Sequence, residues 1–138
     1  MKNLILSLLA ASLLFSSCNQ SSQASASTGS AENAPVMKFE KAIQDFGKLR
    51  VGGKVSYDYK FTNTGKSPLI ITDGTASCGC TKPEWPKTPI KPGESGNIHV
   101  TFNSQGKTPG LQDKLITITA NTVPAQNTMH LIGELTAN

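Results

Sequence analysis

The sequence has 138 residues, few cysteines and no long hydrophobic run. Its three cysteines are Cys18, Cys78 and Cys80. The last two are only two residues apart, so the sequence contains no spaced set of cysteines from which a disulfide framework could be built. We therefore expect the folded domain to depend on its hydrophobic core.

Clustered charge and catalytic patterns are also missing. The net charge is +4, but the basic residues are scattered and form no run, which excludes the basic face typical of nucleic-acid binding. The sequence has no recognisable nucleophile–base pair, phosphate-binding glycine loop or pair of catalytic carboxylates. His99 and His130 lie singly within strand-like patterns. We therefore expect a protein without an enzymatic site.

The N-terminus has the order of a secretory signal. Lys2 supplies a positive start, residues 4–15 form an apolar run broken only by Ser7 and Ser12, and small residues follow. The run is shorter than the about 20 apolar residues that cross a bilayer. We therefore expect residues 1–17 to be a cleaved signal peptide of an exported protein.

Two cleavage sites compete. Residues 14–18 resemble a bacterial lipobox that ends in Cys18, although Phe15 stands where leucine is usual. The alternative is ordinary cleavage at Ala24-Ser25-Ala26, which has the required small-residue form but lies far beyond the apolar run. We favour lipid attachment at Cys18. This predicts an envelope protein, facing the periplasm or bound to the outer membrane through its lipid.

Residues 18–35 are predicted to be a flexible tether after the lipid anchor. They are mostly Ser, Ala, Gln and Gly, and such a segment buries too little apolar surface to offset its ordering entropy. A flexible coil of this length spans on the order of 20–25 Å. The tether would lift a single domain, residues 36–138, just clear of the lipid headgroups.

The domain has the pattern of β-strands. Apolar and polar residues alternate over residues 55–62, 98–102, 116–119 and 129–135, and a further apolar run covers 68–71. Turns rich in Gly, Pro and Asn separate these runs. The pattern predicts an all-β, immunoglobulin-like antiparallel sandwich of about seven strands. We expect the aromatic residues to form its core: Phe39, Phe46, Tyr57, Tyr59, Phe61 and Phe102.

Several stretches together resemble a bacterial family catalogued as domain of unknown function 1573. They are Asp45-Phe46-Gly47, residues 61–65 and 68–71, Ser77-Cys78-Gly79-Cys80-Thr81, Trp85-Pro86, and residues 90–96. The resemblance extends over roughly residues 36–135. It implies an immunoglobulin-type sandwich related to major sperm protein and Hydin-type domains, in an exported protein such as the short lipoproteins of Bacteroidetes. It implies no particular activity.

The pair Cys78 and Cys80 is the place where chemistry is conceivable. A spacing of two puts both side chains on one face of a strand, and in a bend Gly79 can adopt backbone angles closed to other residues. The pair could form a disulfide, act in thiol redox chemistry, or bind a soft metal such as Cu(I). His99 and His130 would add ligands only if the fold brought them near. Lys82, just beyond the pair, could lower the pKa of a thiol. The alternative is an inert loop.

Trp85 lies in a proline-stiffened loop next to the cysteines. It could serve as a contact residue for a partner or cap the sandwich core. Together these features predict a membrane-anchored envelope module that binds a protein or glycan. The alternative function is a redox or soft-metal site at Cys78 and Cys80, and we expect no other cofactor.

Overall fold

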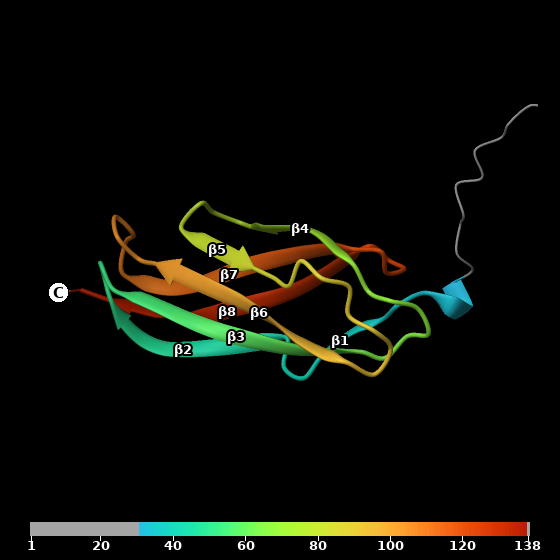
Figure 1. Cartoon of the computed structure of the whole chain (residues 1–138). Coiled ribbons are helices and arrows are strands. Elements are labelled where there is room, and N and C mark those ends of the chain that lie inside the picture. The colour runs from blue at the N-terminus through green and yellow to red at the C-terminus, as the bar shows by residue number, and fades with distance from the viewer. Residues whose placement is uncertain (1–30, 138) are drawn as a thin grey trace, which may run out of the picture.

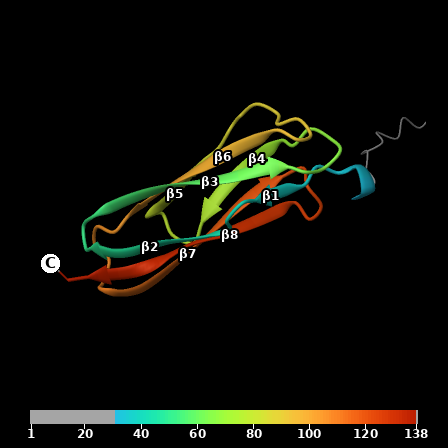
Figure 2. The same cartoon turned by 90° about the horizontal axis from the view of Figure 1, so that it is seen from below.

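The computed structural model describes residues 31–137, which form two β-sheets packed face to face (Figures 1 and 2). The predicted signal peptide, Cys18 and most of the predicted tether lie outside the described residues. The elements are η1 (Ala31–Asn33), β1 (Met37–Phe39), β2 (Ile43–Arg50), β3 (Lys54–Asn63), β4 (Ile71–Ala76), β5 (Thr81–Glu84), β6 (Ser95–Asn103), β7 (Gly110–Ala120) and β8 (Gln126–Thr136). The predicted all-β, immunoglobulin-like sandwich is confirmed.

The strand order is β1-β3-β6-β5 in the first sheet and β2-β8-β7-β4 in the second. The first two strands thus belong to different sheets. Among the described strands, β2 and β8 run parallel, whereas every other pair is antiparallel. Edge strands are β1 and β2 on one side of the sandwich and β4 and β5 on the other (Figure 1).

Eight strands are present within residues 31–137 where about seven were expected. The loop predicted around Pro83 is instead the short strand β5, which pairs with β6. Proline lacks a backbone N–H and is tolerated at a sheet edge, where one side of the strand needs no partner. The expected strand at residues 68–71 is also shifted, because Leu69 only bridges Ile90 and β4 begins at Ile71.

The core forms where the alternating side chains of the two sheets meet. Tyr59, Phe61 and Phe102 are fully buried, and the other three predicted core aromatics pack against them from partly buried positions. The Tyr59 hydroxyl donates a hydrogen bond to the carbonyl of His130 in the facing sheet, at 2.8 Å. Burial raises the pKa of Tyr59 above its usual value, which keeps the phenol neutral.

The Asp45-Phe46-Gly47 stretch is a bulge in β2, where the register with β8 shifts between Asp45 and Lys48. Gly47 has a φ of 67°, and its N–H donates to the Asp45 carboxylate at 2.7 Å. The bulge lets the Phe46 ring lie directly on Gly133, where a Cβ atom would collide with it. The bulge therefore lets the Phe46 ring cover the core beside the parallel pair of β2 and β8.

A buried amide holds one end of the sandwich together. The Asn63 side chain donates to the carbonyls of Ser67 and Ile90, at 2.8 and 2.9 Å, and accepts from the N–H groups of Gly65 and Val36, at 3.0 and 3.3 Å. The side chain is fully buried. It thus joins the residue before β1, the turn after β3 and the segment before β6.

The backbone of Asn63 extends the same junction. Its N–H donates to Glu94 and its carbonyl accepts from Gly93, at 2.9 and 2.8 Å. Gly93 has a φ of 82° after Pro92, as a tight turn with proline followed by glycine requires. The turn of residues 91–94 is therefore fastened to the end of β3.

The chain enters the sandwich at this same end. The Ser67 hydroxyl donates to Asn33 at 2.6 Å, and Pro35 is buried, so the last residues assigned to the tether lie against the domain. The C-terminal end of the described chain lies at the opposite end of the sandwich (Figure 1). Within residues 31–137, no helix is long and apolar enough to cross a membrane.

Replacing Asn63 by Ala should destabilise the domain strongly, because it leaves two carbonyls and two N–H groups at the junction without their partner. A buried polar group without a partner costs about 1–3 kcal/mol, so we expect a loss of about 3 kcal/mol or more in the free energy of unfolding. Chemical denaturation measures it. The matched control is Asn97→Ala at an exposed strand position, expected to change stability by less than about 0.5 kcal/mol. Equal effects of the two substitutions would contradict the role of Asn63.

Candidate functional site

Cys78 and Cys80 lie in the loop between β4 and β5, which crosses from one sheet to the other (Figure 1). Their sulfurs are joined in a disulfide, with a Cα–Cα distance of 5.2 Å. The N–H of Ser77 donates to Leu115 in the second sheet, and Asn103 in the first sheet donates to the Cys80 carbonyl, each at 2.9 Å. The loop is therefore fixed at both ends, and the disulfide lies within it, where the chain crosses from one sheet edge to the other.

Gly79 forms the exposed tip of this loop. A hydrogen bond of 3.2 Å from the Thr81 N–H to the Cys78 carbonyl closes the turn. Gly79 is not among the described glycines with positive φ, so the unusual backbone angles considered from the sequence are not used. Apart from the adjacent Cys78 and Cys80, no residue would lie within 4 Å of a Cβ atom added at Gly79. The tip of the loop is therefore open, and the cysteines on either side of it are half-buried.

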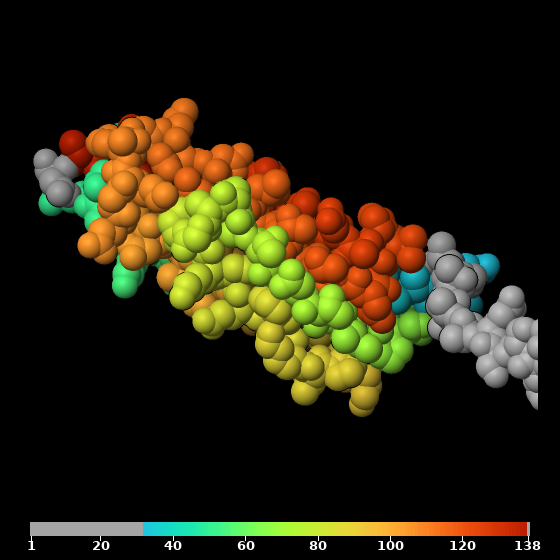
Figure 3. Space-filling model, turned by 90° about the horizontal axis from the view of Figure 1, so that it is seen from above, coloured from blue at the N-terminus to red at the C-terminus, as the bar shows by residue number. Residues whose placement is uncertain are grey.

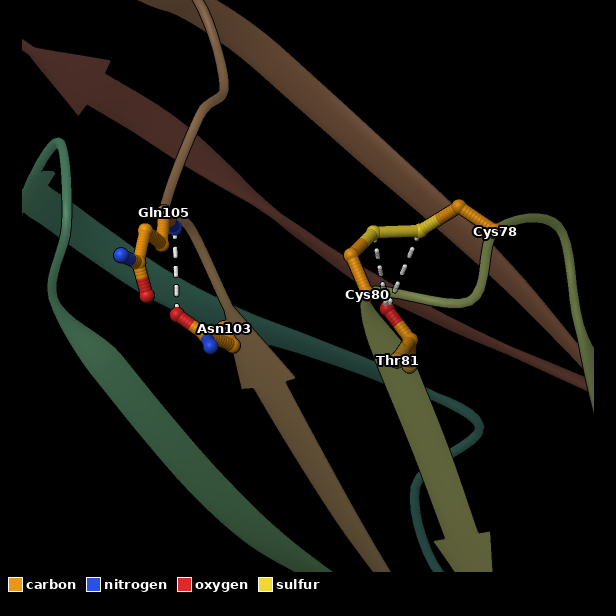
Figure 4. Close-up of a disulfide and its surroundings, with 5 residues drawn as sticks. All are labelled: Cys78, Cys80, Thr81, Asn103 and Gln105. Atoms are coloured by element: carbon orange, nitrogen blue, oxygen red, sulfur yellow. Dashed lines mark hydrogen bonds between the residues drawn. A yellow bond between two sulfur atoms is a disulfide. The ribbon is translucent and has the colours of Figure 1, made fainter.

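Thr81 is a site residue that the sequence reasoning missed. Its side chain is buried, and its hydroxyl lies 3.6 Å from the sulfur of Cys78 and 3.8 Å from that of Cys80 (Figure 4). These distances are within hydrogen-bonding range for sulfur. The indications in the sequence were that Thr81 directly follows the cysteines and ends the stretch of residues 77–81 that carries the family resemblance. The hydroxyl can donate to either sulfur when that sulfur carries a negative charge.

A pocket of about 290 Å³ opens on the Cys80 side of the disulfide. Lys54 and Lys82 line it, and its other described lining residues are uncharged: Gly79, Cys80, Thr101, Asn103 and Gln105. Neither lysine forms an ion pair with another described residue. We call this the lysine pocket.

Strand register explains how the lysine pocket forms. Lys54 on β3 pairs with Asn103 on β6, and Asn103 is hydrogen-bonded to Cys80. Two residues from Asn103 on the same strand β6, Thr101 pairs with Lys82 on β5. Residues two apart on a strand share a face, so both lysines stand on the outer face of the first sheet near Cys80. Lys54 is far away in the sequence, and only the pairing of β3, β6 and β5 brings it to this site.

A second and more open groove, of about 500 Å³, lies on the Cys78 side. It runs between β4 and β5, and its described lining residues are Gly74, Thr75, Ala76, Cys78, Gly79, Thr81, Lys82, Pro83, Glu84 and Trp85. We call it the Trp85 groove. In Figure 3 the green-to-yellow segment that carries β4, the cysteine loop and β5 faces the viewer. The structure thus brings Cys78 and Trp85 into one surface feature.

Trp85 is half-buried and packs against the core. A Cβ atom at Gly74 would collide with the indole ring, so the absence of a side chain at Gly74 is what admits the ring between β4 and β5. The Lys87 ammonium lies over the ring, 3.5 Å from its centroid. The indole N–H is buried without a hydrogen-bond partner among the described residues. The Trp85 ring therefore forms a wall of the groove, and packing contacts rather than a hydrogen bond hold the ring in place.

The two histidines are engaged elsewhere. His99 is 2.7 Å from the Asp58 carboxylate, and His130 is 2.8 Å from that of Asp113. His99 pairs with Glu84. Glu84 is four residues from Cys80, which places His99 about 13 Å along the strand direction from Cys80. Within residues 31–137, no group of three or more His, Cys, Asp or Glu side chains is arranged to hold a metal ion. Among the described residues, neither histidine is therefore placed to bind a metal together with the two cysteines.

Solved structures share this architecture. A Porphyromonas gingivalis W83 protein of unknown function superposes with a TM-score of 0.65 at 22% identity, over 76% of this chain and 49% of its own. This chain thus spans about half the length of that protein. The ASH/PapD-like domain 7 of human CEP192 gives a TM-score of 0.56 at 8% identity, over 78% of this chain and 89% of that domain. Identities this low show the fold alone.

A third similar structure is the Escherichia coli chaperone DraB, with a TM-score of 0.51 at 6% identity, over 75% of this chain and 56% of DraB. None of the curated proteins matches this chain. Residues 37–135, nearly all of the described domain, match the family described as "Protein of unknown function (DUF1573)". The sandwich and its cysteine loop therefore belong to a member of the DUF1573 family.

Proposed function

We propose that this protein is a lipid-anchored module of the bacterial cell envelope that binds an extended segment of a partner protein in the Trp85 groove. The observation that carries the proposal is the position of this groove. It lies where the free edges of both sheets, β4 and β5, run side by side. The proposed anchor is the lipid on Cys18, followed by the tether.

An extended polypeptide suits the groove because a sheet edge offers unpaired backbone groups. On β4, backbone N–H and C=O groups on the side away from β7 are free to pair with an added strand. On β5, Pro83 has no N–H to donate. The added segment would therefore pair along β4, and its side chains would face Trp85 and Pro83.

A glycan suits the groove less well. Sugars are commonly held by stacking on an open aromatic face, but the Lys87 ammonium lies over the Trp85 ring and Gly74 lies against its edge. The polar atom of the indole is also buried. Trp85 therefore offers a partner its packed apolar surface rather than a free ring face, and this favours a protein.

The groove is also well placed for a tethered module. The chain enters the sandwich at the Asn63 end, while the cysteine loop is level with Lys54 at the start of β3. The ten residues of β3 separate these levels by about 30 Å. A domain held to a membrane by its N-terminus would thus hold the disulfide end of the groove away from the lipid surface.

The anchor can be tested with Cys18→Ala. Without the thiol no lipid can be attached, so the protein should leave the membrane fraction or accumulate unprocessed. Fractionation and metabolic acyl labelling measure this, and Ser21→Ala in the same segment is the control that should keep both the label and the membrane association. Unchanged labelling in the Cys18→Ala protein would contradict lipid attachment at this residue.

The binding surface can be tested by photo-crosslinking in intact cells. A benzophenone amino acid in place of Thr75, which is exposed on β4 and lines the groove, should yield a discrete adduct of one mass. The matched position is Thr128, which is exposed on β8 and does not line the groove. Equal adducts at the two positions, or none above background at Thr75, would contradict binding in the groove.

A further inference from the structure

We propose that the Cys78–Cys80 disulfide is a thiol-exchange centre in which a partner thiolate attacks Cys78 from the Trp85 groove and Cys80 leaves into the lysine pocket. The substrate class is a protein dithiol or, in the reverse direction, a protein disulfide. This inference rests on the proposed function only for the route by which a protein substrate arrives. The exchange chemistry depends on the loop itself.

The disulfide contributes little to holding the fold together. A loop closed over three residues stabilises a domain by on the order of 1.5 kcal/mol in the chain-entropy estimate. Both ends of the segment are already fixed by backbone hydrogen bonds to Leu115 and Asn103, and the core lies within the sandwich. The reduced protein should therefore keep its fold, which a centre that alternates between two redox states requires.

The two sulfurs have different surroundings, and this sets the direction of attack. Cys80 lines the lysine pocket with Lys54 and Lys82 and with no described acidic residue. Cys78 lines the Trp85 groove, where Lys82 is also present but is offset by Glu84, and which Lys54 does not line. Positive charge stabilises a thiolate, and the sulfur that forms the more stable thiolate is the better leaving group. Cys80 is therefore the leaving group, and Cys78 is the sulfur that is attacked.

Two further features serve the exchange. The Thr81 hydroxyl, 3.6 and 3.8 Å from the two sulfurs, can donate to whichever sulfur carries the charge (Figure 4). Gly79 lines both the lysine pocket and the Trp85 groove, and the space above it is open. A side chain at position 79 would stand between an incoming thiolate and the disulfide.

The exchange proceeds in two displacement steps at sulfur. The first partner thiolate forms a bond to the Cys78 sulfur, the Cys78–Cys80 bond breaks, and Cys80 leaves as a thiolate. The second partner thiolate then attacks the partner's own sulfur in the mixed disulfide, which releases Cys78. The partner dithiol is oxidised to a disulfide, and its two electrons and two protons reside on the two cysteine thiols. The reverse sequence reduces a partner disulfide.

The role of the lysines can be tested by kinetics on the full chain, purified without reductant. Dithiothreitol is the probe, because it is an uncharged dithiol that completes both steps in one molecule. The double variant K54Q/K82Q should react on the order of fivefold more slowly than the wild type, because the leaving thiolate loses two nearby positive charges. Acid quenching, alkylation and mass spectrometry of the Cys78–Cys80 peptide follow the reaction.

The matched control is K38Q/K66Q, which removes the same charge at exposed positions near the Asn63 end of the sandwich. Its rate should equal that of the wild type. Equal rates for the two double variants would overturn the leaving-group assignment. Because dithiothreitol needs no docking surface, this result is independent of whether the Trp85 groove binds a protein.

The direction of attack can be tested with a monothiol. After brief reaction of the wild-type protein with 2-mercaptoethanol and acid quenching, fragment-ion mass spectrometry locates the mixed disulfide. We expect the adduct on Cys78. An adduct mainly on Cys80, or equally on both residues, would overturn the proposed polarity.

Access can be tested with Gly79→Leu, which should slow the dithiothreitol reaction while leaving the unfolding midpoint close to that of the wild type. Chemical denaturation of the wild-type protein reduced by dithiothreitol shows whether the fold needs the bond without changing the Cys80 side chain that packs against the core, and we expect a loss of no more than about 1.5 kcal/mol. A loss of more than about 3 kcal/mol would identify the disulfide as a structural staple and overturn the proposal.

Discussion

The sandwich depends on the buried amide of Asn63. Two carbonyls and two N–H groups from separate parts of the chain converge on this side chain, and its own backbone holds the turn before β6. An antiparallel sandwich must bring such turns together at its ends, where backbone groups lose their strand partners. One buried side chain with two donors and two acceptor sites satisfies them at once. Gly65 completes the junction, because a Cβ atom there would collide with residues 34–36.

Most of the stretches by which this chain resembles its family have structural roles of this kind. Asp45-Phe46-Gly47 forms the bulge that seals the core beside β8, and residues 61–65 hold the Asn63 junction. The turn at residues 91–94 is fastened to the same junction. Ser77-Cys78-Gly79-Cys80-Thr81 differs from them, because its disulfide closes only a very short loop and lies at the surface between two pockets. This contrast directs the search for function to the cysteine loop.

The two free edges of the sandwich also differ in character. On one side lie β1 and β2, which belong to different sheets. There the Phe46 ring of β2 packs directly on Gly133 of the neighbouring strand β8. On the side of β4 and β5, the crossing loop carries the disulfide, and Trp85 fills the gap over Gly74. The second side combines unpaired backbone, an apolar wall and a disulfide. The proposed binding and thiol exchange both rest on this side of the sandwich.

The sequence by itself determined the fold class, the family and the core aromatics. Alternation of apolar and polar residues and the residues of turns are local properties, so they can be recognised without knowing the order in which the strands pair. Residues 55–62 and 98–102 were predicted close to the observed β3 and β6. It did not predict β5, since a proline is acceptable there only because tertiary structure puts that strand at an edge. The parallel pairing of β2 with β8 is likewise a contact between the two ends of the domain.

For the site, the spacing of Cys78 and Cys80 identified the place but not its surroundings. Lys54 is more than twenty residues from the cysteines in the sequence, and the register of β3 with β6 alone brings it to the lysine pocket. The same pairing leaves His99 beside Asp58, and His130 lies beside Asp113. Tertiary structure decided the part of the asymmetry between the two sulfurs that depends on Lys54, Thr101 and Asn103, because these residues come from strands distant in the sequence. Lys82 and the lining of the Trp85 groove come from residues 74–85, next to the cysteines.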